Sequence, residues 1–156
     1  MKPALVIVDM QPDSWGVANE PTLVSTIVEY INRWKEKNLP IVVVTYYGSG
    51  KTHKDIVSKL KDYSNKTFVR KHDCGGGAEV LNKVKRKKIT HFVMAGVFRC
   101  QCVYETATEI NREANKPVYI PHPLTGCDTF GKQECAYCKH VKTTSTRIVD
   151  KLLKAA

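Results

Sequence analysis

The chain has 156 residues, 42% of them hydrophobic and 26% charged. This length predicts a single domain over residues 1–156 with a sizeable core, and the ordinary composition excludes a disordered chain. The formal net charge of +10 is compatible with an anionic partner, although the lysines are scattered along the sequence. No apolar stretch reaches the length of a membrane span or a signal-peptide core, so we expect a soluble, cytoplasmic protein.

The first half of the chain alternates short apolar runs with a helical pattern. The run ALVIVD (4–9) is continuously apolar and ends in a carboxylate, as in a strand that is buried on both faces. Asn19-Glu20-Pro21 favours a helix start, because it offers an N-cap residue followed by an early proline. The run IVVVTYY (41–47) is rich in β-branched residues and predicts the second strand.

The rest of the chain continues the alternation of strands and helices. We predict, in order, a strand at 67–71, a helix after the glycines at 75–77, a strand at 91–97, a helix to about 115, a strand at 116–121, a helix around 131–141, a short strand at 147–149 and a terminal helix. This order predicts an α/β fold of three layers, in which helices cover both faces of a mostly parallel, roughly six-stranded, Rossmann-like sheet. In such sheets ligands bind beyond the carboxyl ends of the strands.

Three chemically active residues fall at those strand ends. Asp9 ends the first strand, Lys71 ends the third, and Cys102 follows the fourth. Each has an ordinary structural explanation, since Asp9 could cap a loop, Lys71 could be solvated and Cys102 could be a small core residue. Together at one sheet edge they would supply a base, a cation and a nucleophile, a combination that indicates an active site.

Three segments resemble, in the same order, those of the isochorismatase-like cysteine hydrolases, a superfamily that includes nicotinamidases and N-carbamoylsarcosine amidohydrolases. ALVIVDMQPD resembles the opening strand and Asp-x-Gln turn of that family. FVRKHDCGGGAEVLNKV resembles its lysine-bearing strand and the helix that follows. VMAGVFRCQCVYETATEI is similar to the segment Gly-Val-x-Thr-x-x-Cys-Val-x-x-Thr-Ala. The resemblance covers the chain from Ala4 to about Ala114 and implies the isochorismatase-like hydrolase fold.

The segment GVFRCQCVYETA holds two cysteines, Cys100 and Cys102, of which one matches the nucleophile of the family. Aligning Gly96 and Val97 on the motif puts Cys102 at that position. A cysteine in the first turn of a helix is also favoured as a thiolate by the free N–H groups and the helix dipole. Positions two apart on a helix differ by about 200°, so we expect Cys100 to be a neighbour without a catalytic role.

The resemblance implies a mechanism for these residues. Asp9 takes the proton of the Cys102 thiol, Lys71 orients Asp9, and the thiolate attacks an amide-type carbonyl to give a thioester. Backbone N–H groups of Phe98 and Cys102 would form the oxyanion hole, next to a cis peptide bond between Val97 and Phe98. The expected activity is hydrolysis of a C–N bond in a small molecule, without a cofactor, by a chain that forms a homo-oligomer.

The expected substrate pocket includes Gln11, Trp15, Phe98 and Arg99. Trp15 is expected to stack on the substrate, and Arg99, which replaces the threonine of the motif, would either attract an anionic substrate or point to solvent. Nicotinamidases bind a metal through an Asp/His cluster after the second strand, where this chain offers only His53 and Asp55. That difference argues against a metal-dependent nicotinamidase.

Three alternatives remain open. The residues Cys127, Cys135, Cys138 and His140 supply four nitrogen or sulfur ligands for zinc, although Cys135 and Cys138 would equally suit packing or a redox pair. A non-catalytic nucleic-acid binder would use the basic charge, but the densest run, KVKRKK at 83–88, is more simply explained as the charged end of a helix, so nucleic acid is an unexpected partner. Isochorismatase-type hydrolysis, which needs no thiol, is disfavoured by the presence of Cys102.

Overall fold

The computed structural model describes residues 1–127 and 136–156, except the side chains at 136 and 137. Six strands form one parallel sheet in the order β3-β2-β1-β4-β5, and β6 pairs with the end of β4. The strands are β1 (Pro3–Val8), β2 (Ile41–Tyr46), β3 (Lys66–Lys71), β4 (His91–Val97), β5 (Val118–Tyr119) and β6 (Thr125–Gly126). The predicted α/β class and parallel sheet are therefore confirmed.

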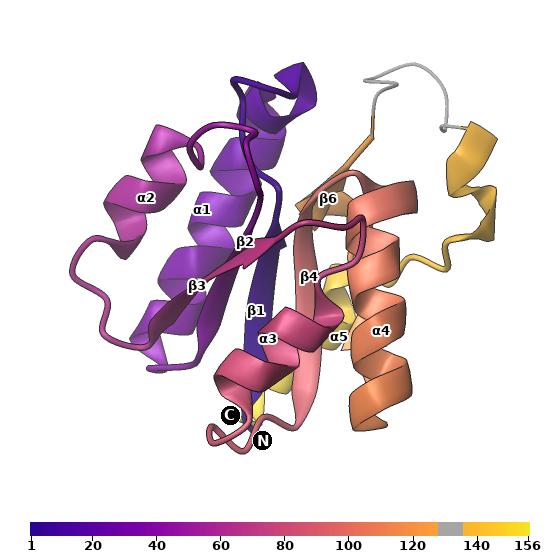
Figure 1. The fold of residues 1–156 in the computed structure, drawn as a ribbon. Helices are drawn as coiled ribbons and strands as arrows, with labels where there is room; N and C mark the ends of the chain where they lie inside the picture. Colours follow the sequence, from indigo (N-terminus) through magenta and orange to yellow (C-terminus); the bar gives the residue numbers. More distant parts are fainter. Residues whose placement is uncertain (128–135) are drawn as a thin grey trace.

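Helices cover both faces of this sheet, as Figure 1 shows. The helices are α1 (Pro21–Glu36), α2 (Lys54–Leu60), α3 (Gly77–Val84), α4 (Tyr104–Ala114) and α5 (Thr146–Lys154). Alternate residues of β1 point to opposite faces, so Leu5 and Ile7 pack with α1, α2 and α5, whereas Val6 and Val8 pack with α3 and α4. This two-sided burial explains why β1 is apolar at every position and carries no polar residue before Asp9.

The helix expected after Asn19-Glu20-Pro21 is α1, and its first turn is capped by Glu20. The Glu20 carboxylate accepts hydrogen bonds from the backbone N–H of Thr22 and Leu23, at 3.1 and 2.6 Å. Pro21 occupies the first helical position, where it lacks only an N–H that would have no helical partner.

Two predicted elements near the C-terminus differ from the structure. The predicted strand at 147–149 is part of α5, whose N-cap Ser145 accepts a hydrogen bond from Arg147 N–H. Val149, Leu152 and Leu153 are buried on one face of α5. Their spacing of three and four residues is typical of a helix, and it is a stronger signal than the short β-branched run that suggested a strand. Part of the predicted helix at 131–141 lies outside the described residues, and its described end, Ala136–His140, is a 3-10 helix.

The helix α2 was not predicted from the sequence. It is only seven residues long, and just two of its residues, Ile56 and Leu60, are buried, so its apolar pattern is too short to be recognised. His53 caps it by accepting a hydrogen bond from Asp55 N–H at 3.2 Å.

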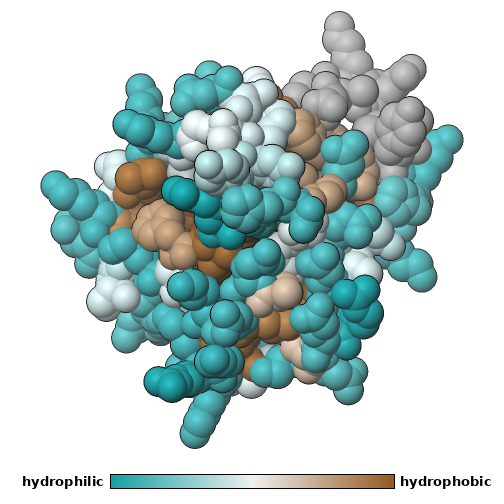
Figure 2. Space-filling view, viewed as in Figure 1, coloured by the Kyte–Doolittle hydropathy of each residue, from teal (hydrophilic) through white to brown (hydrophobic). Residues whose placement is uncertain are grey.

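The face of the molecule in Figure 2 is largely hydrophilic, with separate hydrophobic areas between the charged side chains. The exposed large hydrophobic residues of the described chain are Met1, Tyr47, Val57 and Phe68. Within the described residues no helix combines the length and the apolar character that crossing a bilayer requires.

Candidate active site

Asp9 follows directly after β1, at the carboxyl edge of the sheet. Its φ of 51° places the backbone in the left-handed region, which aspartate tolerates better than most residues. Its N–H donates to Val44 O at 2.9 Å, which ties the turn to β2. The residue is fully buried, so its carboxylate lies beneath the edge and not in solvent.

Lys71, at the end of β3, forms an ion pair with Asp9. The Lys71 Nζ atom lies 2.8 Å from Asp9 Oδ2, and neither side chain is more than 1% exposed. The same ammonium donates to the backbone carbonyls of Asp73 and Cys74, at 3.2 and 2.6 Å. These oxygen acceptors replace the water molecules that the ammonium loses on burial, so Lys71 is held in one position.

The glycines after Lys71 let its carbonyl partners pack against α4. Glu109 of α4 accepts a hydrogen bond from Gly77 N–H at 2.7 Å. A Cβ atom at Gly75 would lie 2.0 Å from the Glu109 carboxylate, so a larger residue would displace this contact. The glycine run therefore fixes the loop that receives Lys71.

Gly96 brings the end of β4 against β1. Its φ is 106°, and a Cβ atom there would lie 2.0 Å from Val8 O, so only glycine fits at this position. The peptide bond between Val97 and Phe98 is cis, as the resemblance implied. The following turn, Arg99–Val103, is π-helical, with Val103 N–H donating to Phe98 O across five residues.

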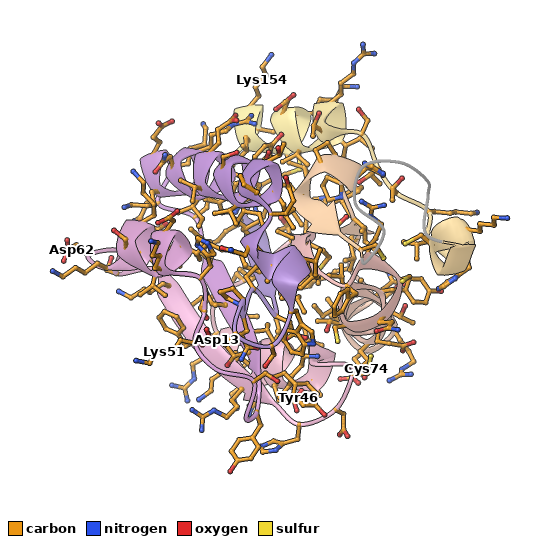
Figure 3. All side chains as sticks on the ribbon, turned by 90° about the horizontal axis from the view of Figure 1, so that it is seen from above. Asp13, Tyr46, Lys51, Asp62, Cys74 and Lys154 are labelled. Carbon is orange, nitrogen blue, oxygen red and sulfur yellow. The ribbon has the colours of Figure 1, made fainter. Side chains whose placement is uncertain are left out.

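This turn places the Cys102 thiol beside Asp9 and Lys71, close enough that both groups shift its pKa. Cys102 is 9% exposed, so the sulfur lies at the boundary between the core and the surface. The structure thus brings together the three residues that the strand-end argument selected. Figure 3 looks onto this edge from above and labels Tyr46 and Cys74, which lie next to Lys71 in the pairing and hydrogen-bond pattern.

Burial is the largest single influence on the pKa of each of the three groups. It raises the pKa of Asp9 above its ordinary value although Lys71 and Cys102 stabilise the carboxylate. For Lys71, burial alone would lower the pKa, but Asp9 outweighs it and the pKa is raised. Burial and then the negative charge of Asp9 raise the pKa of Cys102 to about 12.

In the substrate-free protein the pKa of Cys102 is therefore raised, opposite in direction to the stabilisation of a thiolate expected from the helix dipole. Cys102 lies in the π-helical turn before α4, where burial and the adjacent carboxylate outweigh any helix-terminal effect. With its pKa raised to about 12, the Cys102 sulfur is a thiol near neutral pH, and it lies beside the Asp9 carboxyl group. Such a pair can transfer a proton when the sulfur attacks an electrophile.

Gln11 does not extend toward a substrate. It is fully buried, and its side-chain amide binds the backbone of the neighbouring loop: Nε2 donates to Tyr46 O and Gly50 O, and Oε1 accepts from Tyr46 N–H at 2.7 Å. With these bonds Gln11 joins the turn after β1 to the turn after β2.

Trp15, Tyr46 and Phe98 form an aromatic group at the same edge. The Trp15 ring lies 6.2 Å from Tyr46 and 6.0 Å from Phe98 between centroids, and both pairs are T-shaped. Phe98 and Trp15 are half-buried. Tyr46 was not among the predicted site residues, although the same strand-end argument, applied to β2, selects it.

Arg99 neither reaches a pocket mouth nor points to solvent, so both expectations for it are wrong. It is 7% exposed, and its guanidinium donates to Thr125 Oγ1 at 2.8 Å, Thr125 O at 2.5 Å and His122 O at 3.2 Å. Arg99 thereby joins β6, and His122 before it, to the turn that carries Cys102.

The predicted zinc ligands are only partly brought together. Cys127 and Cys138 are in contact, with their sulfurs 3.1 Å apart, and Cys100 joins them at 3.2 Å from Cys127. His140 instead packs edge-on against Tyr104, with 4.8 Å between ring centroids. Cys135 lies outside the described residues.

A second thiol lies near Cys102. Cys74 is exposed, and its Sγ lies 3.8 Å from that of Cys102. Its position three residues after Lys71 is the feature of the sequence that could have placed Cys74 near the site.

His53, the histidine considered for a nicotinamidase-type metal, is used within the fold. Its Nε2 atom lies 3.1 Å from Asn19 Oδ1, and its Nδ1 atom accepts the α2 cap bond from Asp55 N–H. Both ring nitrogens therefore have protein partners.

The sequence and the fold both match known proteins. The sequence model of the isochorismatase domain matches residues 3–125. A search of curated proteins gave no match to the sequence.

Among solved structures, an isochorismatase-like hydrolase from Alkaliphilus metalliredigens superposes with a TM-score of 0.76 at 18% identity, covering 99% of each chain. N-carbamoylsarcosine amidase from Thermoplasma acidophilum has a TM-score of 0.71 at 18% identity, covering 96% of this chain and 94% of that one. A nicotinamidase/pyrazinamidase from Bacillus subtilis has a TM-score of 0.70 at 17% identity, covering 81% and 87%. At these identities the structures show a shared fold.

Proposed function

Because this chain belongs to the isochorismatase domain family of hydrolases, we propose that it is a cysteine-dependent hydrolase that cleaves a C–N bond of a small amide or carbamoyl compound. The observation that carries this proposal is the buried contact among the Cys102 thiol, the Asp9 carboxylate and the Lys71 ammonium. A nucleophile, a base and an orienting cation in one contact group form the minimum apparatus for covalent hydrolysis.

In the first half of the proposed reaction, Cys102 Sγ attacks the carbonyl carbon while its proton passes to Asp9. The negative charge then develops on the substrate oxygen, where the backbone N–H groups of Phe98 and Cys102 would each contribute about 3–4 kcal/mol of stabilisation. The C–N bond breaks, and protonated Asp9 returns its proton to the leaving nitrogen. The products of this half are an amine or ammonia and a thioester on Cys102.

In the second half, water attacks the thioester carbon and gives a proton to Asp9. The C–S bond breaks, the acid is released, and the proton of Asp9 returns to the sulfur. Lys71 stays protonated throughout, because Asp9 raises its pKa. Its role is to orient Asp9 and to limit the rise of the Asp9 pKa.

The walls of the site favour a small, planar substrate. Trp15 and Phe98 are half-buried aromatic side chains next to the catalytic group, and Arg99 is directed away, toward 122–125. The substrate would therefore be held by ring contacts and hydrogen bonds more than by a salt bridge to Arg99. Among the fold neighbours, those named as an amidase and a nicotinamidase suggest the compounds to try first.

The experiment is a panel of nicotinamide, N-carbamoyl amino acids and ureides, assayed for released ammonia. Wild-type protein should release ammonia from at least one compound, and Cys102→Ala should not. Activity that persists in Cys102→Ala would instead support isochorismatase-type hydrolysis by Asp9 and Lys71 alone. Salt-sensitive binding of oligonucleotides without hydrolysis of any compound would support the nucleic-acid alternative.

The expected homo-oligomer stays a prediction, which light scattering of the purified protein can check.

A further inference from the structure

Three cysteines outside the Asp9–Lys71–Cys102 group converge on one point. Cys100 lies in the π-helical turn, Cys127 follows β6, and Cys138 comes from the 3-10 helix Ala136–His140. The sulfur of Cys127 lies 3.2 Å from that of Cys100 and 3.1 Å from that of Cys138, and all three lie within 4.8 Å of one another. We call Cys100, Cys127 and Cys138 the sulfur cluster.

The spacing of the sulfur cluster suits a metal ion better than a disulfide. Zinc–sulfur bonds of about 2.3 Å at tetrahedral angles separate the sulfurs by about 3.8 Å, which the cluster reaches by small side-chain shifts. A disulfide needs a separation of about 2.0 Å and joins only two of the three sulfurs. The third sulfur would then take no part in the bond, whereas a metal uses all three.

The charge around the cluster also suits a metal. A divalent ion with three thiolates carries a net charge of −1, which is costly in a site where Cys127 and Cys138 are each only 7% exposed. Arg99 is the chain neighbour of Cys100, is itself buried, and forms no ion pair with any described residue; its partners are the neutral oxygens of Thr125 and His122. A metal-bound cluster would supply a negative charge in the same turn as this buried guanidinium, whose partners named above are all neutral.

The thiols of the cluster are poorly acidic without a metal. Burial, and then the neighbouring sulfurs, raise the pKa of Cys100 above its ordinary value. Binding of a divalent cation overcomes this by displacing the thiol protons, so uptake of the metal should release protons.

We propose that Cys100, Cys127 and Cys138 bind a soft divalent metal ion, with Zn²⁺ as the expected occupant. Three thiolates are a zinc-selective ligand set and leave one position of the tetrahedron for a further ligand. The metal would fasten the chain after β6, at Cys127 and Cys138, to the turn that also carries Cys102. The role is structural, and it holds whether or not the proposed hydrolase activity is correct.

The test is the metal content of the full chain, purified under reducing conditions, incubated with Zn²⁺ and desalted. Wild-type protein should retain about one zinc per chain, and Cys100→Ser, Cys127→Ser and Cys138→Ser should each lower zinc affinity by about 10–100-fold or more. Cys74→Ser and His140→Ala are matched controls: the first removes a thiol outside the cluster, and the second removes the predicted ligand that packs on Tyr104. Both should retain the metal.

Replacement of zinc by Co²⁺ reports the ligand type independently of activity. Thiolate ligands give the Co²⁺ protein a sulfur-to-metal charge-transfer absorption, which the wild type and Cys102→Ala should show and the three serine variants should lose. Wild-type protein that binds neither ion would overturn the proposal. Retention of zinc by all three serine variants, or its loss from His140→Ala, would overturn the assignment of ligands.

A measurement on the wild type alone covers the case in which a serine variant does not fold. Alkylation of the three cluster cysteines, followed by mass spectrometry, should slow by at least about tenfold when zinc is present instead of a chelator. Equal rates in the two conditions, or a disulfide between any two cluster cysteines in the zinc-treated protein, would show that the cluster is not a metal site.

Discussion

Cys100 and Cys102 lie two residues apart in the same π-helical turn, yet their sulfurs enter different surroundings. Cys102 meets a carboxylate and an ammonium, whereas Cys100 meets two other sulfurs. Burial raises the pKa of both thiols, so burial does not separate their roles. What differs is the partner: Asp9 can accept a proton from Cys102, and the partners of Cys100 can share a metal with it.

The two sulfur sites also differ in where their partners lie in the chain. Asp9, Lys71 and Cys102 all fall within residues 3–125, which match the isochorismatase domain. Cys127 and Cys138 lie beyond that range. The Asp9–Lys71–Cys102 group therefore lies within the matched domain, and a metal at the sulfur cluster would attach a segment that follows it. Arg99 joins Thr125, near the end of the matched range, to the same turn.

The largest expected effect separates the two cysteines directly. Cys102→Ala should lower kcat/KM for the amide identified in the panel by at least about 10⁴-fold, because it removes the nucleophile. Cys100→Ala should lower it by less than about tenfold, since it removes only a neighbour of the catalytic turn. Steady-state kinetics of both folded variants measures this, and equal losses would contradict the division of roles.

The ion pair should show the next largest effect, on stability. Lys71→Met leaves the Asp9 carboxylate buried without its cation and should lower the free energy of unfolding by about 3–5 kcal/mol. The double variant Asp9→Asn with Lys71→Met should recover part of that loss, because no unpaired charge remains. Urea unfolding followed by circular dichroism measures both, and a double variant that is less stable than Lys71→Met would argue against the pairing.

The pH dependence of kcat/KM shows whether activity follows the ionisation of Asp9 or that of the Cys102 thiol. Asp9 must be ionised to accept the proton, and burial raises its pKa above the ordinary value of 3.8, so kcat/KM should fall as the pH drops through that raised value. Above that pKa, kcat/KM should level off. A preformed thiolate with a pKa of about 12 would instead give an increase of about tenfold per pH unit into the alkaline range.

The smallest expected effect concerns thiol reactivity in the zinc-loaded protein without substrate. Cys74 is exposed and should be alkylated first by iodoacetamide, and Cys102 should react more slowly because it is 9% exposed and un-ionised. A chelator should speed the labelling of the cluster cysteines and leave the rate at Cys74 unchanged. Faster labelling of Cys102 than of Cys74 would show that Cys102 is a thiolate at rest.

The strands and the residues at their carboxyl ends could be predicted from the sequence, because short stretches of the chain determine them. The runs that form β1, β2 and β4 are apolar because both sheet faces are covered, and residues that follow such runs meet at one edge, which is how Asp9, Lys71 and Cys102 were found. The orientation of Arg99 and the convergence of Cys100 with Cys127 and Cys138 depend on where a distant loop returns to the sheet. No spacing along the chain encodes that contact.

The central claim, that Cys102 forms a covalent intermediate while Cys100 does not, is tested most directly by trapping the thioester. The protein is mixed with the amide identified in the panel, quenched in acid within the first turnover, and digested for mass spectrometry. The account predicts a mass increase equal to the substrate acyl group on Cys102 alone. An acyl group on Cys100 or Cys74, or turnover without any adduct that continues in Cys102→Ala, would contradict it.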